Sequence, residues 1–153
     1  MTILEALQEV KNEMPWIKTF IYADLNEANA TETDKLVESE YPVMIVFPIN
    51  PVDTIPNSGL TKTTFELNAM FLNKSAQKTT DYKSSEIEIE VIAPMRLIAR
   101  KYIHVLATHS IIDPETPGIT TVNYQPVYSS MDANLFGVSV RAQVPVLENP
   151  ALC

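Results

Sequence analysis

Apolar side chains at every second position near the C-terminus constrain the fold of this chain most strongly. Successive side chains of a β-strand lie on opposite faces of a sheet, so the alternation over residues 135–146 predicts a strand with one buried face. A second strand is predicted over residues 121–128, and a turn over residues 129–134 would pair the two strands as a hairpin. The positions expected in the core are Phe136, Val138, Val140, Ala142, Val144 and Val146.

Three further strands are predicted upstream. Residues 16–22 are aromatic and β-branched, and residues 41–49 form a near-continuous apolar run that is typical of a strand buried on both faces. The prolines and glycines of residues 50–61 and 110–120 predict two long loops. Residues 63–73 alternate, and the side chains expected on one face are Phe65, Leu67, Ala69 and Phe71.

Two amphipathic helices are predicted, over residues 2–14 and 85–107. Thr2 and Glu5 have the spacing of a capping box at the start of the first helix. In the second helix the apolar stripe continues in register across Pro94, so we expect one helix with a kink at the proline. The stripe of the first helix is Ile3, Leu7, Val10 and Met14.

The order of these elements predicts an α+β fold. Short connections between several strands favour a mixed or mainly antiparallel sheet of about five strands, with two helices packed on one face. Residues 1–146 are expected to form a single domain and residues 147–153 a C-terminal extension, since 153 residues suit one domain. The acidic residues 24–40 predict at most a short helix around 33–38.

The charge of the chain argues against nucleic-acid binding. Nineteen acidic and eleven basic residues give a net charge of −8. Proteins that bind DNA or RNA gain affinity from Lys and Arg side chains that neutralise phosphates, so we expect no specific binding. The single cysteine, Cys153, allows no disulfide within the chain and suits synthesis in the cytoplasm. We also expect no signal peptide and no membrane span.

Motifs that carry catalysis are missing from the sequence, so we expect a protein that is not an enzyme. There is no Gly-x-Ser-x-Gly elbow around a nucleophile, and the isolated glycines form no phosphate loop. His104 and His109 fit one helical face poorly, so we expect no metal site and no cofactor. A weaker alternative is a small enzyme that uses His109, Asp113 and Glu115.

Apolar residues in the two predicted loops indicate contacts with other proteins. Both loops exceed the median connection of ~4–6 residues, and a free loop rarely carries so many branched apolar side chains. Arg96 and Arg100 share a helical face and would reach acids of a neighbouring subunit, or would instead complement the helix dipole in solvent. The candidate interface residues are Val52, Ile55, Leu60, Arg96, Arg100, Ile111, Ile112, Ile119 and Leu152.

Three short motifs carry a family resemblance. They are Tyr-Pro-Val-Met-Ile-Val-Phe-Pro at 41–48, Tyr-Gln-Pro-Val-Tyr at 124–128 and Asp-Ala-Asn-Leu-Phe-Gly-Val-Ser-Val at 132–140. With the order of elements over residues 1–146, they resemble the small neck and tail-completion proteins of tailed bacteriophages, the tail-terminator-like group.

The resemblance implies an α+β structural subunit of an oligomeric ring in the virion neck or tail. Such a ring joins head and tail, and the genome DNA passes through it without specific binding. The implied partners are copies of the chain itself and neighbouring portal, connector or tail proteins. The protein would be synthesised in the host cytoplasm and would end in the virion.

A different interpretation is a ligand-binding or host-attachment accessory domain of a virion. Its binding site would be a pocket or a glycan platform lined by aromatic side chains. Trp16 and Tyr22 also fit the core of the domain, so the aromatic residues alone do not distinguish the two interpretations. The residues that would line the site are Trp16, Tyr22, Tyr124 and Tyr128.

Overall fold

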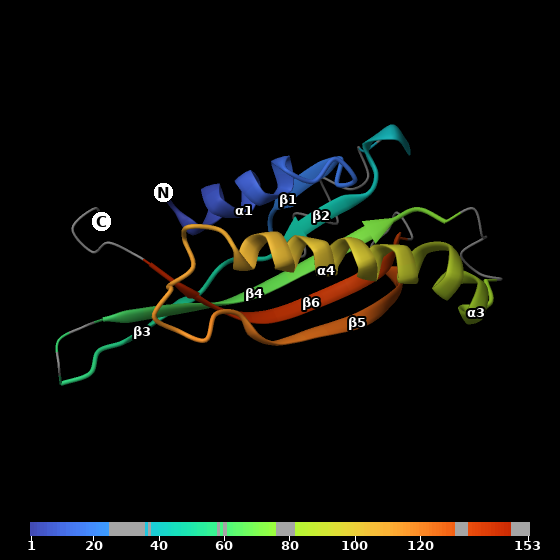
Figure 1. The fold of residues 1–153 in the computed structure, drawn as a ribbon. Coiled ribbons are helices and arrows are strands. Elements are labelled where there is room, and N and C mark those ends of the chain that lie inside the picture. The colour runs from blue at the N-terminus through green and yellow to red at the C-terminus, as the bar shows by residue number, and fades with distance from the viewer. Residues whose placement is uncertain are drawn as a thin grey trace.

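The computed structural model describes residues 1–24, 36, 38–57, 59, 61–75, 82–130 and 135–147. Figure 1 shows one sheet with the helices α1 and α4 over the same face, so the predicted α+β class is confirmed. The elements are α1 (Ile3–Asn12), β1 (Thr19–Tyr22), η3 (Glu38–Glu40), β2 (Val43–Val46), β3 (Pro51–Thr54), β4 (Lys62–Asn73), α3 (Ser84–Ile87), the π-helical turn η4 (Glu88–Ile92), α4 (Ala93–Ala107), β5 (Thr120–Ser130) and β6 (Leu135–Val146).

The sheet has six strands in the order β1-β2-β4-β6-β5, and β3 pairs with β4 beside this path. Strands β1 and β2 run parallel, and the other pairs are antiparallel. The prediction of a mixed, mainly antiparallel sheet is therefore confirmed. The prediction of a loop over residues 50–61 is wrong for β3, because these four residues find a partner in the start of β4.

Strand β4 is the centre of the sheet. One of its edges pairs with β2 and then with β3, while the other pairs with β6 from Thr63 to Asn73. Every second side chain of β4 and β6 is buried toward the helices, as the alternation predicts. Val140 of β6 is fully buried in the main core.

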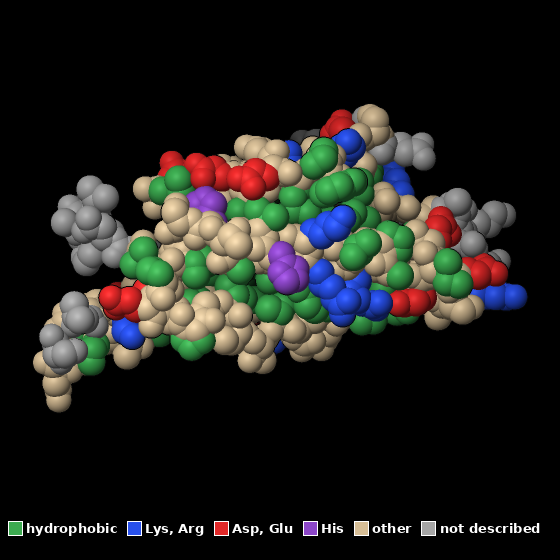
Figure 2. Space-filling view, viewed as in Figure 1, with side chains coloured by type: hydrophobic (Ala, Val, Ile, Leu, Met, Phe, Trp, Pro, Cys, Tyr) green, Lys and Arg blue, Asp and Glu red, His purple; other side chains and the backbone are tan. Residues whose placement is uncertain are grey.

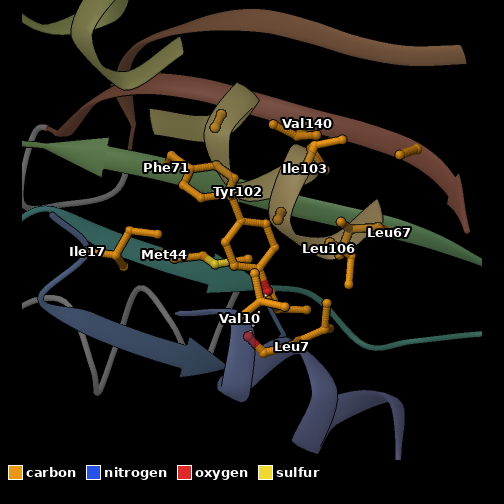
Figure 3. Packing of buried hydrophobic residues seen from close by; sticks show 14 of the residues in the cluster. Leu7, Val10, Ile17, Met44, Leu67, Phe71, Tyr102, Ile103, Leu106 and Val140 are labelled. Carbon is orange, nitrogen blue, oxygen red and sulfur yellow. Dashed lines mark hydrogen bonds between the residues drawn. The ribbon is translucent and has the colours of Figure 1, made fainter. Parts of the chain in front are cut away.

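The main core lies between the sheet and the two helices. Figure 3 shows Tyr102 of α4 pointing toward α1, with Phe71 and Met44 beside it. Its ring meets Phe71 edge-on at 5.5 Å between centroids, and its hydroxyl donates a hydrogen bond of 2.8 Å to the carbonyl oxygen of Leu7. Burial raises the pKa of Tyr102. This bond holds α1 against α4, because a buried hydroxyl needs a partner.

Helix α1 begins at the predicted capping box. The backbone N–H of Thr2 donates to Oε2 of Glu5 at 2.6 Å, and the N–H of Glu5 donates to the Thr2 hydroxyl at 3.2 Å. The helix buries the face predicted by its stripe, including Leu7 and Val10. Thr2 and Glu5 thus satisfy two of the N–H groups that a helix leaves open at its start.

The second predicted helix is continuous but changes geometry before Pro94. Segments α3, η4 and α4 follow one another from Ser84 to Ala107, and the N–H of Ala93 bonds the carbonyl of Glu88, five residues earlier. A proline in an α-helix removes one hydrogen bond and clashes with the carbonyl four residues before it. The wider π turn precedes Pro94 and allows the helix to continue, where the sequence predicted a simple kink.

The sheet face away from the helices is divided into an apolar and a polar part. Its apolar part is a second cluster of buried residues, formed by Ile21, Ala23, Tyr41, Val43, Ile45, Leu72 and Leu135. Further along β5 and β6 the side chains of this face are polar, among them Asn123, Gln125, Ser139 and Arg141.

Some predictions concern residues outside the described part of the chain. Leu60, Leu152 and most of the predicted short helix at 33–38 lie there. The proposed extension over residues 147–153 is described only at Leu147, so it stays a prediction.

Candidate functional site

A hairpin arm projects beyond the helices at one end of the molecule (Figure 1). We define the arm as residues 51–57 together with residues 62–65. All four residues of β3 are exposed, Val52 by 64%, and Ile55 just after the strand by 72%. The Thr63 hydroxyl donates to Oδ1 of Asp53 at 2.7 Å and fixes β3 against β4. The arm therefore presents two branched apolar side chains to solvent on an ordered scaffold.

A second exposed apolar surface lies on the helix layer. Figure 2 shows apolar side chains interspersed with basic ones over α4, whereas acidic side chains gather over α1. We define the helix-side patch as Trp16, Ile89 and Leu97, which are exposed by 48%, 77% and 56%. Nζ of Lys101 lies 4.5 Å from the centre of the Trp16 ring, so a cation adjoins the patch.

The sequence interpretation missed the helix-side patch. It placed Trp16 in the core or in a ligand pocket, but the ring is half exposed on the surface. The sequence could have revealed the patch through Ile89 and Leu97, because both are apolar but lie outside the buried helical stripe that contains Ile87 and Val91. Large apolar residues off the stripe of an amphipathic helix indicate a second contact surface.

Arg96 and Arg100, predicted to reach a neighbour, both have partners within the chain. Nη1 of Arg96 bonds Oε1 of Glu88 at 2.9 Å. The guanidinium of Arg100 lies 5.6 Å from the centre of the Tyr124 ring. Burial raises the pKa of Tyr124, and the charge of Arg100 partly opposes this increase.

Three of the predicted interface residues have an explanation within the subunit. Ile111 and Ile112 are buried in the main core, and Ile119 packs against it. The chain after α4 returns to the end of β6, where Ile112 forms a bridge with Val146 and the N–H of Leu147 donates to the carbonyl of Ile111 at 2.8 Å. Their apolar side chains therefore need no partner protein.

The histidine at the end of the second helix has a structural environment. Nδ1 of His109 accepts the N–H of Ile111 at 3.1 Å, so the neutral ring carries its proton on Nε2 and donates it to Glu9 Oε2 at 2.8 Å. Asp113 is buried and its Oδ1 accepts the N–H of Glu115 at 3.0 Å, which stabilises a turn. Within the described ranges, no group of three or more His, Cys, Asp or Glu side chains is placed to hold a metal ion.

The four aromatic residues of the ligand-binding interpretation have separate surroundings. Trp16 lies under Lys101, and the Tyr22 hydroxyl accepts the N–H of Ile49 at 3.1 Å. Tyr124 faces Arg100 and Tyr128 stacks on Tyr82 at 6.2 Å.. A hollow of about 210 Å³ on the opposite sheet face is lined instead by Asn123, Gln125, Ser139 and Arg141.

The sequence matches no protein-family model and no curated protein. No helix within the described ranges combines the length and the apolar character needed to cross a membrane. The arm and the helix-side patch are therefore the candidate functional surfaces of the described residues.

Proposed function

We propose that this chain is a non-enzymatic structural subunit of a bacteriophage neck or tail, and that copies of it form a ring joining head and tail around the DNA channel. Its partners are copies of itself and neighbouring portal, connector or tail proteins in the virion, after synthesis in the host cytoplasm. The observation that carries the proposal is the projecting arm with exposed Val52 and Ile55. The resemblance to tail-completion proteins supplies the virion setting.

The arm is suited to contact another protein. Covering exposed apolar side chains of the arm with a partner would stabilise the complex by roughly 1.5–3 kcal/mol for each fully buried Val or Ile. Association itself costs about 4–15 kcal/mol in lost freedom of motion. Val52 and Ile55 alone do not offset that cost, so a ring contact must include further surface on each subunit.

The net charge supports passage of DNA without binding. At −8 the subunit repels phosphates on average, and a ring of such subunits offers DNA little attraction. The sheet face around Asn123 and Gln125 is mainly polar, and the charge of its Arg141 is offset by Glu66, whose Oε1 lies 3.7 Å from the arginine Nε. A passive channel needs this weak interaction, because tight phosphate binding would hold the genome in place.

The oligomeric state tests the proposal. Light scattering during size-exclusion chromatography should give a mass that is a multiple of the 17.1 kDa chain. The double variant Val52→Ser and Ile55→Ser should shift this mass toward the monomer, while circular dichroism stays unchanged because both side chains are exposed. Thr54→Ala, on the same exposed strand, is the matched control and should remain oligomeric. A wild-type chain that is monomeric at all accessible concentrations contradicts the ring.

A further inference from the structure

We propose that the helix-side patch receives the arm of a second copy of this chain. Val52 and Ile55 of one subunit would then pack on Ile89, Leu97 and Trp16 of the next. The inference rests on the proposed function for the existence of a ring, and it adds the two surfaces that form the contact.

Both surfaces are exposed and apolar, so contact between them would remove apolar side chains of both from water. The arm is a thin projection in Figure 1 and carries two branched apolar side chains, whereas the patch combines Ile89 of η4, Leu97 of α4 and Trp16 after α1. Ala93 and Pro94 are exposed and uncharged between Ile89 and Leu97, whereas the exposed Glu90 lies beside Ile89 at one end of the patch. Contiguous exposed apolar residues with a polar rim are typical of protein interaction sites.

The arm cannot reach the patch of its own subunit. Pairing with β4 and the hydrogen bond between Asp53 and Thr63 hold the arm in line with the sheet, beyond one end of the helices. Ile89 lies in η4, toward the opposite end of the helix layer. A contact between such unlike surfaces joins subunits head to tail, and a head-to-tail contact with a suitable rotation closes into a ring.

Charge favours contact at the end of the patch formed by Leu97 and Trp16, since the exposed Glu86 and Glu90 lie on either side of Ile89 at the other end. Copies that each carry −8 repel one another, so contact is least opposed where basic side chains adjoin the apolar surface. Arg100 and Lys101 follow Leu97 on α4, and Lys101 covers the Trp16 ring. The arm carries one acidic side chain, Asp53, which accepts a hydrogen bond from Thr63, and one basic side chain, Lys62, on the strand opposite Thr54.

Pairing through the sheet edges formed by β3 and β5 is disfavoured. Strand β3 has only four residues and begins with Pro51, which has no N–H to donate. Strand β5 is longer but contains Pro126 and two register shifts along its pairing with β6. Such features protect an edge against addition of another strand, so side-chain contact between arm and patch is the better route to assembly.

Cross-linking between single cysteines tests the contact. In a Cys153→Ser background, which removes the only native thiol, Val52→Cys and Leu97→Cys variants with different tags would be co-expressed and oxidised. We expect a disulfide-linked dimer that contains one copy of each variant, because the proposed contact brings residue 52 of one subunit next to residue 97 of the other. A disulfide forms only where the two Cβ atoms lie about 3.5–4.5 Å apart. A short bismaleimide cross-linker would detect pairs that are somewhat farther apart. Each variant expressed alone should give no covalent dimer.

The alternative outcomes are distinct. Dimers from Val52→Cys alone or from Leu97→Cys alone indicate like surfaces in contact and overturn the head-to-tail inference. An oligomer in which the mixed pair does not cross-link overturns the inference and leaves the ring intact. A monomeric wild-type chain instead contradicts the proposed function itself.

Substitution of the patch gives an independent measurement. The double variant Ile89→Ser and Leu97→Ser should raise the dissociation constant of the oligomer at least tenfold with unchanged circular dichroism, because both side chains are exposed. Tyr128→Ser, an exposed aromatic on β5 outside both surfaces, is the control and should leave assembly unchanged. Equal association of the patch variant and wild type overturns the inference.

Discussion

Replacing Gly137 with alanine should destabilise the pairing of the two central strands. Gly137 lies on β6 opposite Leu72 of β4. A Cβ atom at this position would stand 1.9 Å from the carbonyl oxygen of Phe71 and 3.0 Å from Cα of Leu72. Both atoms belong to the backbone, so no side-chain rotation relieves the clash, and the strands must separate or shift.

Two opposing contributions set the change in the free energy of unfolding of Gly137→Ala: the clash in the folded state and the lower entropy of the unfolded chain. Forcing an extra group into a closely packed site costs typically 1–3 kcal/mol and occasionally more, and a clash with backbone belongs at about 3 kcal/mol or above. Alanine restricts the unfolded chain and returns about 0.4–1 kcal/mol. The free energy of unfolding should therefore fall by about 2–3 kcal/mol, which lowers the melting temperature by about 4–12 °C for a chain of this size.

Urea unfolding of wild type and Gly137→Ala measures this loss directly. Gly118→Ala is the matched control, since Gly118 has open space around its Cβ position but a φ of +82°. The free energy of unfolding of Gly118→Ala should fall by only roughly 1 kcal/mol, which is the cost of holding an alanine in a left-handed backbone conformation. A Gly137→Ala variant that loses less than its Gly118 counterpart would refute the argument from close strand approach.

Three further changes probe separate parts of the fold. Tyr102→Phe removes the bond to the Leu7 carbonyl and should lower the free energy of urea unfolding by about 1 kcal/mol, and an unchanged midpoint contradicts the bond. Val140→Asp buries an unpaired charge in the core and should prevent folding, so a soluble, folded product contradicts its assigned face. Hydrogen bonds from Thr2, chiefly its backbone N–H, lower the pKa of Glu5 from 4.5. The ionised carboxylate therefore stabilises the fold above pH 4.5, and this contribution is lost as the pH falls through the lowered pKa. The melting temperature of Glu5→Gln should be lower than that of wild type at pH 7, and the two should become equal in acid. A difference in melting temperature that does not change with pH contradicts the stabilising role of the ionised Glu5 carboxylate.

The sequence predicted those elements whose signal is local. Alternation along β6 indicates directly which side chains face the core, and Val138 and Val140 are buried accordingly. The capping box of Thr2 and Glu5 is likewise a contact between near neighbours in the chain. Strand β3 was missed because Pro51 within it and Pro56 after it favour a loop, and because its pairing with β4 depends on tertiary contacts.

The candidate interface was predicted in part. Val52 and Ile55 are exposed, so no contact within the subunit explains their apolar character, and their role in an interface stays a prediction. Ile111 and Ile112 were assigned to the same role, but they are buried by the return of the chain to the end of β6, a contact that no local pattern encodes. Leu97 carried a readable signal, because an apolar residue off the buried stripe of a helix has no place in the core.

The central position of β4 has a consequence for biosynthesis. Its long edge from Thr63 to Asn73 is completed only by β6, the last strand of the described sheet in chain order. During translation this edge remains open while β1 to β4 have already left the ribosome. An unpaired central strand with apolar side chains is a template for mispairing between nascent chains. Expression should therefore respond strongly to temperature and to chaperones, even though the edge strands of the described sheet, β1, β3 and β5, are short or interrupted.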